Sequence, residues 1–346
     1  MQVTGTRQRE AWLAREFPPV EEVTSGIWSI PVPIPDSPLR YVLSYLIEHQ
    51  SGFLMVDTGW DHPASWEALT AGLRECQIPM SAITAVVITH VHPDHHGLSR
   101  AVQEQTGAWI GMHEREDTFL ASHADPDVMR DRLTGYLRLC GAPPEHLAEI
   151  ATSRDPGRRP GPMARADRLI AHGDRIDVPG LDLRAIWTPG HSPGHLCFHD
   201  AARGLLLTGD HVLPRITPNV SVYDMMTGPL DEYLASLAAL RGIAPDEVLP
   251  AHEYRFTDLD GRLDDLVAHH QERLDEVIGA LRAVPAGQSA WQVATRVPWS
   301  RPWDQLSAFP RQAALGEVVA HLRHLEGQGR AGYADAGGVA LWRAIS

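Results

Sequence analysis

The segment that most constrains this chain holds four histidines and one aspartate within seven positions, in the order His90-Val91-His92-Pro93-Asp94-His95-His96. It follows the apolar run 83–88, whose β-branched residues predict a buried strand that ends just before the histidines. In an extended chain His90 and His92, two positions apart, point to the same side, so both can reach one ion. The proline stops the strand, and Asp94 and His95 therefore approach from another direction. The segment therefore predicts a transition-metal site, and it can supply ligands to two adjacent ions.

Length and composition narrow the classes of protein. With 346 residues, the chain is long enough for one large domain and a smaller one. The net charge of −14 argues against a surface for polyanions, and nucleic acid is disfavoured as a partner. The sequence contains no lysine, so all 30 fixed basic side chains are arginine. This excludes a phosphate-binding lysine of a P-loop and a lysine that forms a Schiff base.

The cysteines and the N-terminal segment bear on the cellular setting. Cys76, Cys140 and Cys197 are far apart and form no CxxC pair, which predicts neither a disulfide framework nor a thiolate zinc site. Residues 1–20 lack the apolar core of a signal peptide, and no later run approaches the length of a membrane span. We therefore expect a soluble cytoplasmic protein with no membrane partner.

Three later segments repeat the arrangement of an apolar strand followed by a histidine or an aspartate. The predicted strands and the residues to which they lead are 181–187 with His191, 204–208 with Asp210, and 247–250 with His252. An earlier strand, 52–57, ends in the turn Asp57-Thr58-Gly59. Ligands gathered from several strand ends onto one rim are what a metal site on a β scaffold requires.

Together these motifs resemble those of the metallo-β-lactamase-fold hydrolases. The matching residues are His90, His92, Asp94, His95, His191, Asp210 and His252, with Asp57-Thr58-Gly59 as a structural turn. The resemblance covers about residues 25–255. It implies an α/β fold, the αββα sandwich in which two mixed sheets lie face to face with helices outside. The expected domains are an extension at 1–24, a catalytic domain at 25–262 and a tail at 263–346.

Two regions depart from the strand pattern. Residues of about 113–173 show helical stretches, and this insertion either forms a lid or substrate wall or simply packs on the scaffold. The tail has the pattern of three helices and a hairpin, with Ser289 as the cap of the middle helix. It is similar to the winged-helix domain of the β-lactamase-like endoribonucleases and their bacterial relatives.

The resemblance also implies how the ligands divide between two ions. The expected groups are His90, His92 and His191 for the first ion, Asp94, His95 and His252 for the second, and Asp210 as the bridge. Imidazole and carboxylate without thiolate suit two Zn2+ ions, with iron or manganese as alternatives. Such a pair supplies hydroxide at neutral pH and polarises the oxygen under attack. Asp94 is the predicted catalytic residue, because it can pass a proton to the leaving group.

Other polar residues near the motifs are expected to have lesser roles. Those that support the ligands or the fold are His96, His195, His199 and His211. Weaker candidates for lining a substrate pocket follow the bridging aspartate, and these are Arg215, Asn219 and Tyr223.

Three functions fit these features. The first is hydrolysis of a small acyl substrate by an esterase, thioesterase or lactonase, the second is phosphodiester or RNA cleavage, and the third is DNA-binding regulation with a structural metal. Residues 285–346 contain six arginines and four acidic residues. A surplus of two positive charges is small for a surface that binds nucleic acid. The tail is expected to pack or to form a homodimer. We predict a dinuclear zinc hydrolase of carboxylic esters, thioesters or lactones, with RNA cleavage as the main alternative.

Overall fold

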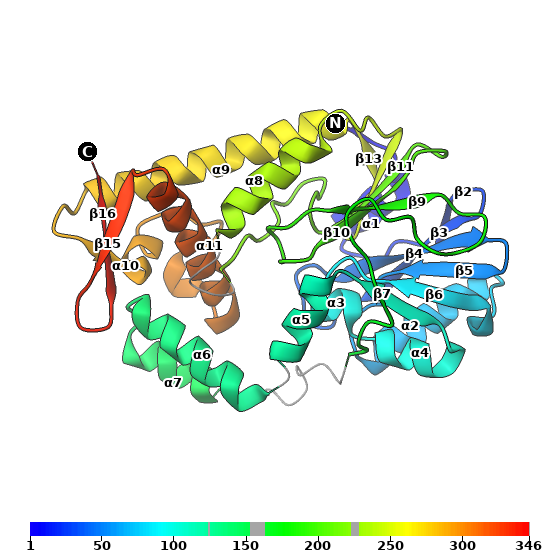
Figure 1. The fold of residues 1–346 in the computed structure, drawn as a ribbon, viewed down its shortest axis with the longest axis horizontal. Helices are drawn as coiled ribbons and strands as arrows, with labels where there is room; N and C mark the ends of the chain where they lie inside the picture. The colour runs from blue at the N-terminus through cyan, green and yellow to red at the C-terminus, as the bar shows by residue number, and fades with distance from the viewer. Residues whose placement is uncertain (124, 153–162, 223–227, 346) are drawn as a thin grey trace. The chain divides into compact units, whose positions relative to one another are not determined.

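The computed structural model describes residues 1–123, 125–152, 163–222 and 228–345 (Figure 1). Its contacts divide the chain into two compact units. The first comprises 1–121, 157–218 and 238–263, and the second comprises 122–156, 219–237 and 264–346. The expected start of the tail at 263 lies beside one of these divisions, but much of the helical insertion groups with the tail. The domain limits themselves stay predictions.

The first unit contains a seven-stranded sheet. In sheet order its strands are β2 (Glu21–Thr24), β3 (Ile27–Pro33), β4 (Tyr41–His49), β5 (Gly52–Val56), β6 (Ile83–Val87), β7 (Trp109–Met112) and β8 (Arg168–Leu169). β2 to β5 pair antiparallel, whereas β5 to β8 pair parallel. Ala85, Val86 and Val87 of β6 are fully buried, which confirms the strand predicted ahead of the histidines.

The same unit contains a six-stranded sheet. In sheet order its strands are β1 (Gln2–Val3), β13 (Phe256–Thr257), β12 (Glu247–Pro250), β11 (Leu205–Gly209), β10 (Leu196–Asp200) and β9 (Leu183–Trp187). β11 and β12 pair parallel, and the other neighbours pair antiparallel. The expected strands that lead to His191, Asp210 and His252 are therefore confirmed as β9, β11 and β12.

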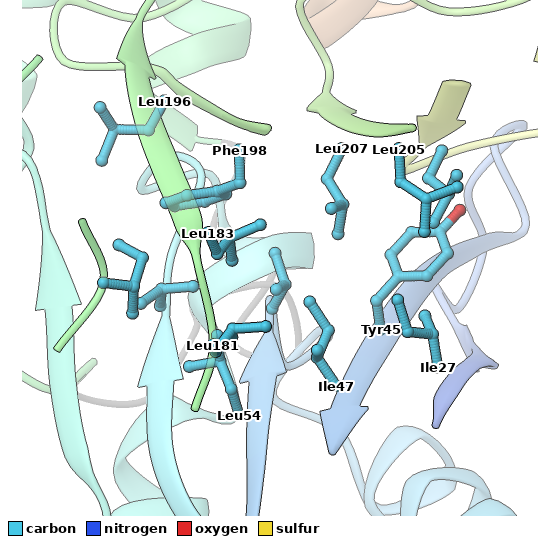
Figure 2. Close-up of a cluster of buried hydrophobic side chains, with 14 of the residues drawn as sticks. Ile27, Tyr45, Ile47, Leu54, Leu181, Leu183, Leu196, Phe198, Leu205 and Leu207 are labelled. Carbon is cyan, nitrogen blue, oxygen red and sulfur yellow. The ribbon is translucent and has the colours of Figure 1, made fainter. Parts of the chain in front are cut away.

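The two sheets face each other across one apolar core. Figure 2 shows Ile47 and Leu54 of the seven-stranded sheet opposite Phe198 and Leu207 of the six-stranded sheet, and all four side chains are almost completely buried. At about 25 cal/mol per Å2 of apolar surface, burial of each such side chain contributes about 1.5 to 3 kcal/mol. This core holds the strand ends of both sheets in fixed positions at the edge where the candidate ligands lie.

Helices cover the outer face of the seven-stranded sheet. The helices of this unit include α1 (Thr6–Ala14), α2 (Pro63–Glu75), η1 (Met80–Ala82), α3 (Pro93–His96), α4 (Ser99–Thr106) and α5 (Glu114–Ser122). α2 begins after His62, whose side chain accepts a hydrogen bond from the Ala64 amide, and it buries Leu69 and Leu73 against the sheet. The predicted α/β class with two facing sheets and outer helices is confirmed.

Residues 175–178 have the alternating apolar pattern that predicts a strand, but they do not form one. Within that segment only an isolated bridge forms, between Arg175 and Arg184. The Ile176 amide still donates to Leu183 O, but the Val178 amide donates to Ile176 O at 2.8 Å, so the backbone curls and the pairing does not continue. Gly180 then turns the chain with φ 81°, a conformation open to glycine. Ile176 and Val178 are nevertheless buried in the core, which explains the strand-like apolar pattern.

The second unit is mainly helical. Its elements include α6 (Pro126–Leu139), α7 (Pro144–Thr152), β14 (Gln288–Ser289), α10 (Ala290–Ala294), η3 (Trp303–Gln305), α11 (Ala308–Gly327), β15 (Ala331–Asp335) and β16 (Ala340–Ala344). Two more helices, α8 (Pro229–Leu240) and α9 (Leu259–Arg282), contribute residues to both units. None of the helices in the described ranges combines the length and the apolar character needed to cross a membrane.

The tail has the expected order of helices followed by a hairpin. Its sheet has the order β14-β16-β15. Ser289 accepts a hydrogen bond from the Gln292 amide, and the Gln292 side chain accepts one from the Ser289 amide, so the predicted cap is confirmed as a capping box. Assignment of the tail as a winged-helix domain stays a prediction.

A buried histidine pair predicts acid sensitivity of the tail. His321 Nδ1 donates to Glu317 O at 2.7 Å, and its Nε2 lies 3.2 Å from His270 Nδ1, which can donate to it when both rings are neutral. Burial, with repulsion from the neighbouring positive groups, lowers the pKa of His270 from 6.5 to about 2. Burial also lowers the pKa of His321, to about 3, although the Glu317 carbonyl opposes the shift.

In both cases the unfolded chain takes up a proton near pH 6.5 while the folded chain does not, so stability falls as pH drops below about 6.5. We expect amide exchange in α9 and α11, corrected for the intrinsic pH dependence, to be faster at pH 5 than at pH 7. His321→Gln, which cannot take up the proton, should reduce this difference. Equal protection at both pH values in the unaltered chain would contradict the prediction.

Candidate metal centre

The candidate ligands follow strand ends that lie at one edge of the sandwich. β5 and β6 are parallel neighbours in one sheet (Figure 1). β11 and β12 are parallel neighbours in the other sheet. Because parallel strands end at the same edge, Asp57 and His90 emerge together, as do Asp210 and His252. His191 arrives on the loop after β9. The structure therefore brings the residues singled out in five separate segments to one place.

Three histidines form the first cluster of donor atoms. His191 Nε2 lies 3.2 Å from His90 Nε2 and 3.1 Å from His92 Nδ1. Burial, followed by the neighbouring charge of His191, lowers the pKa of His92 to about 3. Burial and neighbouring histidines likewise lower the pKa of His90 well below its usual value. Neutral rings with converging nitrogens can offer three lone pairs to one cation.

The second cluster combines histidines with carboxylates. Asp94 Oδ2 lies 3.5 Å from His252 Nε2 and 3.9 Å from His95 Nε2. Asp210 Oδ1 lies 3.2 Å from His252 Nε2 and 3.5 Å from His95 Nε2, whereas its Oδ2 lies 3.6 Å from His191 Nε2. The two oxygens of Asp210 thus face the two clusters, as a bridging residue would require.

Several of these atoms are buried without a hydrogen-bond partner. His95 Nε2, His252 Nε2 and Asp210 Oδ1 are all inaccessible to solvent and accept or donate no well-formed hydrogen bond. They face one another at 3.2–3.5 Å but make no hydrogen bond to any group outside the cluster. Imidazole nitrogen and carboxylate oxygen are suitable ligands for transition metals. These histidines and aspartates are therefore positioned for a metal site.

The charges in the second cluster point to the same conclusion. Burial alone would raise the pKa of Asp94, but the charge of His95 and the contact with His252 leave that pKa at about 2. Burial lowers the pKa of His252, but Asp210 and Asp94 outweigh it and raise the pKa to about 10. The carboxylates thus favour positive charge between them. A divalent cation supplies that charge and displaces the ring protons on binding.

Each of three rings is oriented through its second nitrogen. His252 Nδ1 donates to Tyr41 O at 2.7 Å, which directs Nε2 into the cluster. His95 Nδ1 lies 2.8 Å from Asp57 Oδ2, and His90 Nδ1 lies 3.0 Å from Thr89 Oγ1. Such partners fix the tautomer and the ring plane of a metal-binding histidine.

Asp57 connects several parts of this edge. Its Oδ1 accepts from the Thr89 amide and its Oδ2 from the Thr89 hydroxyl, both at 2.8 Å. The backbone at Asp57 has φ 59°, a left-handed conformation that aspartate tolerates better than most residues. Thr58 donates from both its amide and its hydroxyl to His95 O. The structure thus gives the predicted Asp57-Thr58-Gly59 turn a direct part in holding His95.

The supporting histidines have packing and hydrogen-bonding roles. His96 Nε2 lies 2.9 Å from Ala164 O, and His195 binds Thr188 through Nδ1 and accepts from the Asp210 amide through Nε2. His211 is fully buried, whereas His199 lies half-buried on β10. None of the four belongs to the groups of converging donor atoms found in the described residues.

The weaker pocket candidates receive less support. Arg215 forms an ion pair with Glu253 at 2.8 Å, next to His252 in sequence. Asn219 accepts from the Ser221 hydroxyl and belongs to the second compact unit. Tyr223 lies outside the described residues. Arg215 is therefore tied to a loop that bears a candidate ligand.

Sequence reasoning missed Glu116 in the first turn of α5. This carboxylate is fully buried and accepts hydrogen bonds from the Val91 amide at 2.8 Å, the Ser192 hydroxyl at 2.7 Å and the Gly194 amide at 2.6 Å. In the sequence it resembles Glu114 and Asp117 of the same helix, so no signal distinguishes it. Tyr41 was missed for a similar reason, because it acts through a backbone carbonyl.

Gly194 is packed so closely that a side chain cannot be added without movement. A Cβ there would lie 2.8 Å from Glu116 Cγ and 2.9 Å from the Glu116 backbone nitrogen. We expect Gly194→Ala to destabilise the protein by about 1–3 kcal/mol. Thermal unfolding would measure this, with Gly135→Ala, where nothing lies within 4 Å, as the matched control. Equal melting temperatures for the two variants would contradict the packing argument.

Comparison with known proteins agrees with the fold and the site. The two facing sheets define an α/β protein, and the cluster of histidines and aspartates at the strand ends is suited to bind a metal ion. The chain belongs to the Metallo-beta-lactamase superfamily, whose profile matches residues 37–252. The matched residues include all seven candidate ligands.

Two solved structures are similar over almost the whole chain. A metallo-beta-lactamase family protein from Thermus thermophilus is 28% identical with a TM-score of 0.77, covering 94% of this chain and 100% of its own. A beta-lactamase domain protein from Burkholderia ambifaria is also 28% identical, with a TM-score of 0.80 and 94% of each chain covered. The similarity therefore extends through the tail as well as the sandwich.

In each of two curated relatives, the match covers less than two thirds of the relative's own length. The lactamase-like protein vrtG of Penicillium aethiopicum is 27% identical over 241 residues, which are 70% of this chain and 61% of vrtG. The atrochrysone carboxyl ACP thioesterase of Aspergillus fumigatus is 25% identical over 248 residues, which are 72% of this chain and 46% of that protein.

Proposed function

We propose that the chain is a hydrolase of carboxylic thioesters, esters or lactones that uses two zinc ions, with iron or manganese as alternative metals. The observation that carries the proposal is the convergence of seven largely buried histidine and aspartate side chains, several with unpaired donor atoms, at one edge of the sandwich. Thioesters are the favoured class because one relative bears the name of an acyl carrier protein thioesterase.

The proposed ligands fall into the two clusters described above. His90, His92 and His191 would hold one ion, Asp94, His95 and His252 the other, and Asp210 would face both. When bound, the ions supply a nucleophilic water at neutral pH and polarise the carbonyl oxygen of the substrate. The protein then needs no side-chain nucleophile, and the described cysteines have pKa values raised by burial, which leaves them as poorly reactive thiols.

Asp94 is the proposed proton carrier. It is the most exposed of the carboxylates in the two clusters, with 14% of its side chain accessible against 9% for Asp210. Its Oδ2 faces His95 and His252, so Oδ1 is the oxygen that can accept a proton and release it to the sulfur or oxygen that leaves. Its position between His95 and His252 keeps it ionised beforehand.

The test is a substrate panel assayed after chelation and again after zinc is restored. We expect acyl thioesters to be hydrolysed only when metal is present, with esters and lactones as further substrates. Single-stranded RNA is included because the order of elements in the tail led to the RNA alternative, and β-lactams because of the family name. Cleavage of RNA without turnover of any acyl substrate would refute the proposal, as would full thioester turnover in the chelated protein.

A further inference from the structure

Glu116 joins the two loops that carry the three-histidine cluster. One loop, after β6, contains His90 and His92, and the Val91 amide between them donates to Glu116 Oε2 at 2.8 Å. The other loop, after β9, contains His191, and the adjacent Ser192 hydroxyl donates to Oε1 at 2.7 Å, as does the Gly194 amide at 2.6 Å. The loops come from different sheets, so a single carboxylate spans the sandwich at this point.

These three hydrogen bonds are charge-assisted and buried. Bonds to an ionised carboxylate contribute about 1.5–3 kcal/mol, more than neutral ones. Burial raises the pKa of Glu116, whereas the three donors oppose that shift by stabilising the anion. The close packing of Gly194 against Glu116 leaves the second loop little freedom to move away.

The charge of Glu116 also complements the chemistry of the cluster. The three ligands His90, His92 and His191 carry no negative charge of their own, and Asp210 Oδ2 lies 3.6 Å from His191 Nε2. The second cluster, by contrast, contains Asp94. A buried anion held against the backbone of both histidine loops stabilises a divalent cation bound to neutral ligands.

We propose that Glu116 is the positioning residue of the three-histidine cluster, setting the distance between the His90–His92 loop and the His191 loop so that one cation binds all three rings. The proposal rests on the proposed metal-dependent function. Glu116 belongs to none of the groups of candidate ligands, and it acts through the Val91 and Gly194 amides and the Ser192 hydroxyl.

The test compares metal affinity in Glu116→Gln and Glu114→Gln. The glutamine at 116 keeps the size of the side chain but removes its charge and turns an N–H group toward one of the three donors. Glu114 is exposed on the same helix and is the matched control. We expect Glu116→Gln to weaken at least one Zn2+ or Co2+ binding step about 10- to 100-fold, the range for loss of a group that supports a metal ligand. Glu114→Gln should bind like the unaltered protein.

Affinity is measured by competition with a chromophoric chelator, on protein whose folded state is checked by circular dichroism. A merely structural role would lower the melting temperature of the metal-free protein and leave the affinity of the folded protein unchanged. Glu116→Asp is the second variant, since it keeps the charge but shortens the side chain, and it should bind more weakly because it cannot reach both loops. Unchanged affinity in Glu116→Gln, or full affinity in Glu116→Asp, would overturn the proposal.

The test of the Glu116 role and the test of the proposed function can fail independently. Failure of the unaltered protein to bind metal or to hydrolyse any acyl substrate would refute the function itself. Normal metal binding and hydrolysis in Glu116→Gln would refute only the positioning role.

Discussion

Asp210→Ala is expected to remove at least one bound metal ion and to reduce hydrolysis by more than the roughly 10- to 100-fold that follows loss of a supporting group. The two carboxylate oxygens lie 3.2 Å from His252 Nε2 and 3.6 Å from His191 Nε2, so the residue faces both clusters. Alanine leaves these rings without the charge that binds a cation between them. Metal content per chain and the rate with an acyl thioester measure the two effects.

Asp131→Ala provides the control, because this aspartate is 78% exposed on α6 in the second unit. It should keep both the metal and the activity. Two ions retained in Asp210→Ala would contradict the bridging role, even if the activity fell.

Asp57→Ala should cause the largest loss of stability among single substitutions near the site. It leaves three buried donors without acceptors, the Thr89 amide, the Thr89 hydroxyl and His95 Nδ1, at about 1–3 kcal/mol each. Alanine at φ 59° adds about 1–2 kcal/mol of backbone strain. We therefore expect a loss of several kcal/mol and, in any protein that still folds, weaker metal binding.

Asp57→Asn separates these contributions. Asparagine tolerates the left-handed backbone and keeps one oxygen acceptor, but its NH2 group opposes a neighbouring donor. Calorimetry should place its melting temperature between those of Asp57→Ala and the unaltered protein. Asp182→Ala, at a half-exposed surface aspartate, should leave the melting temperature unchanged. A stable Asp57→Ala protein with full metal content would show that the turn does not hold His95.

Local patterns in the sequence predicted the strands of the sandwich and the loops that bear the candidate ligands. β6 is predictable because a run of β-branched residues stops at a histidine cluster. β9, β11 and β12 are predictable because each run is followed within a few residues by a histidine or an aspartate. In such cases the burial of the strand and the chemistry of the following residue are both local properties. Long-range pairing then follows from the closure of two apolar faces on one core.

Other features depend on the tertiary structure and leave no local trace. β1, β8 and β13 have two residues each, too few for a period to be visible. Ile176 is buried like a strand residue although its backbone curls. Glu116 is distinguished from Glu114 only by the loops that fold against it, and the Tyr41 carbonyl that orients His252 is common to every residue type.

The three rings of the first cluster differ in which nitrogen they present. His92 offers Nδ1, whereas His90 and His191 offer Nε2. The Nδ1 atom is two bonds from Cβ, as is the side-chain oxygen of asparagine. The Nε2 atom is three bonds from Cβ by the shorter path around the ring, as is the side-chain oxygen of glutamine. The donor nitrogen is therefore closer to Cβ in His92 than in His90 and His191. Engineering that replaces its nitrogens by oxygens must use asparagine at 92 and glutamine at 90 or 191, and a reversed choice would move the donor atom by about one bond length.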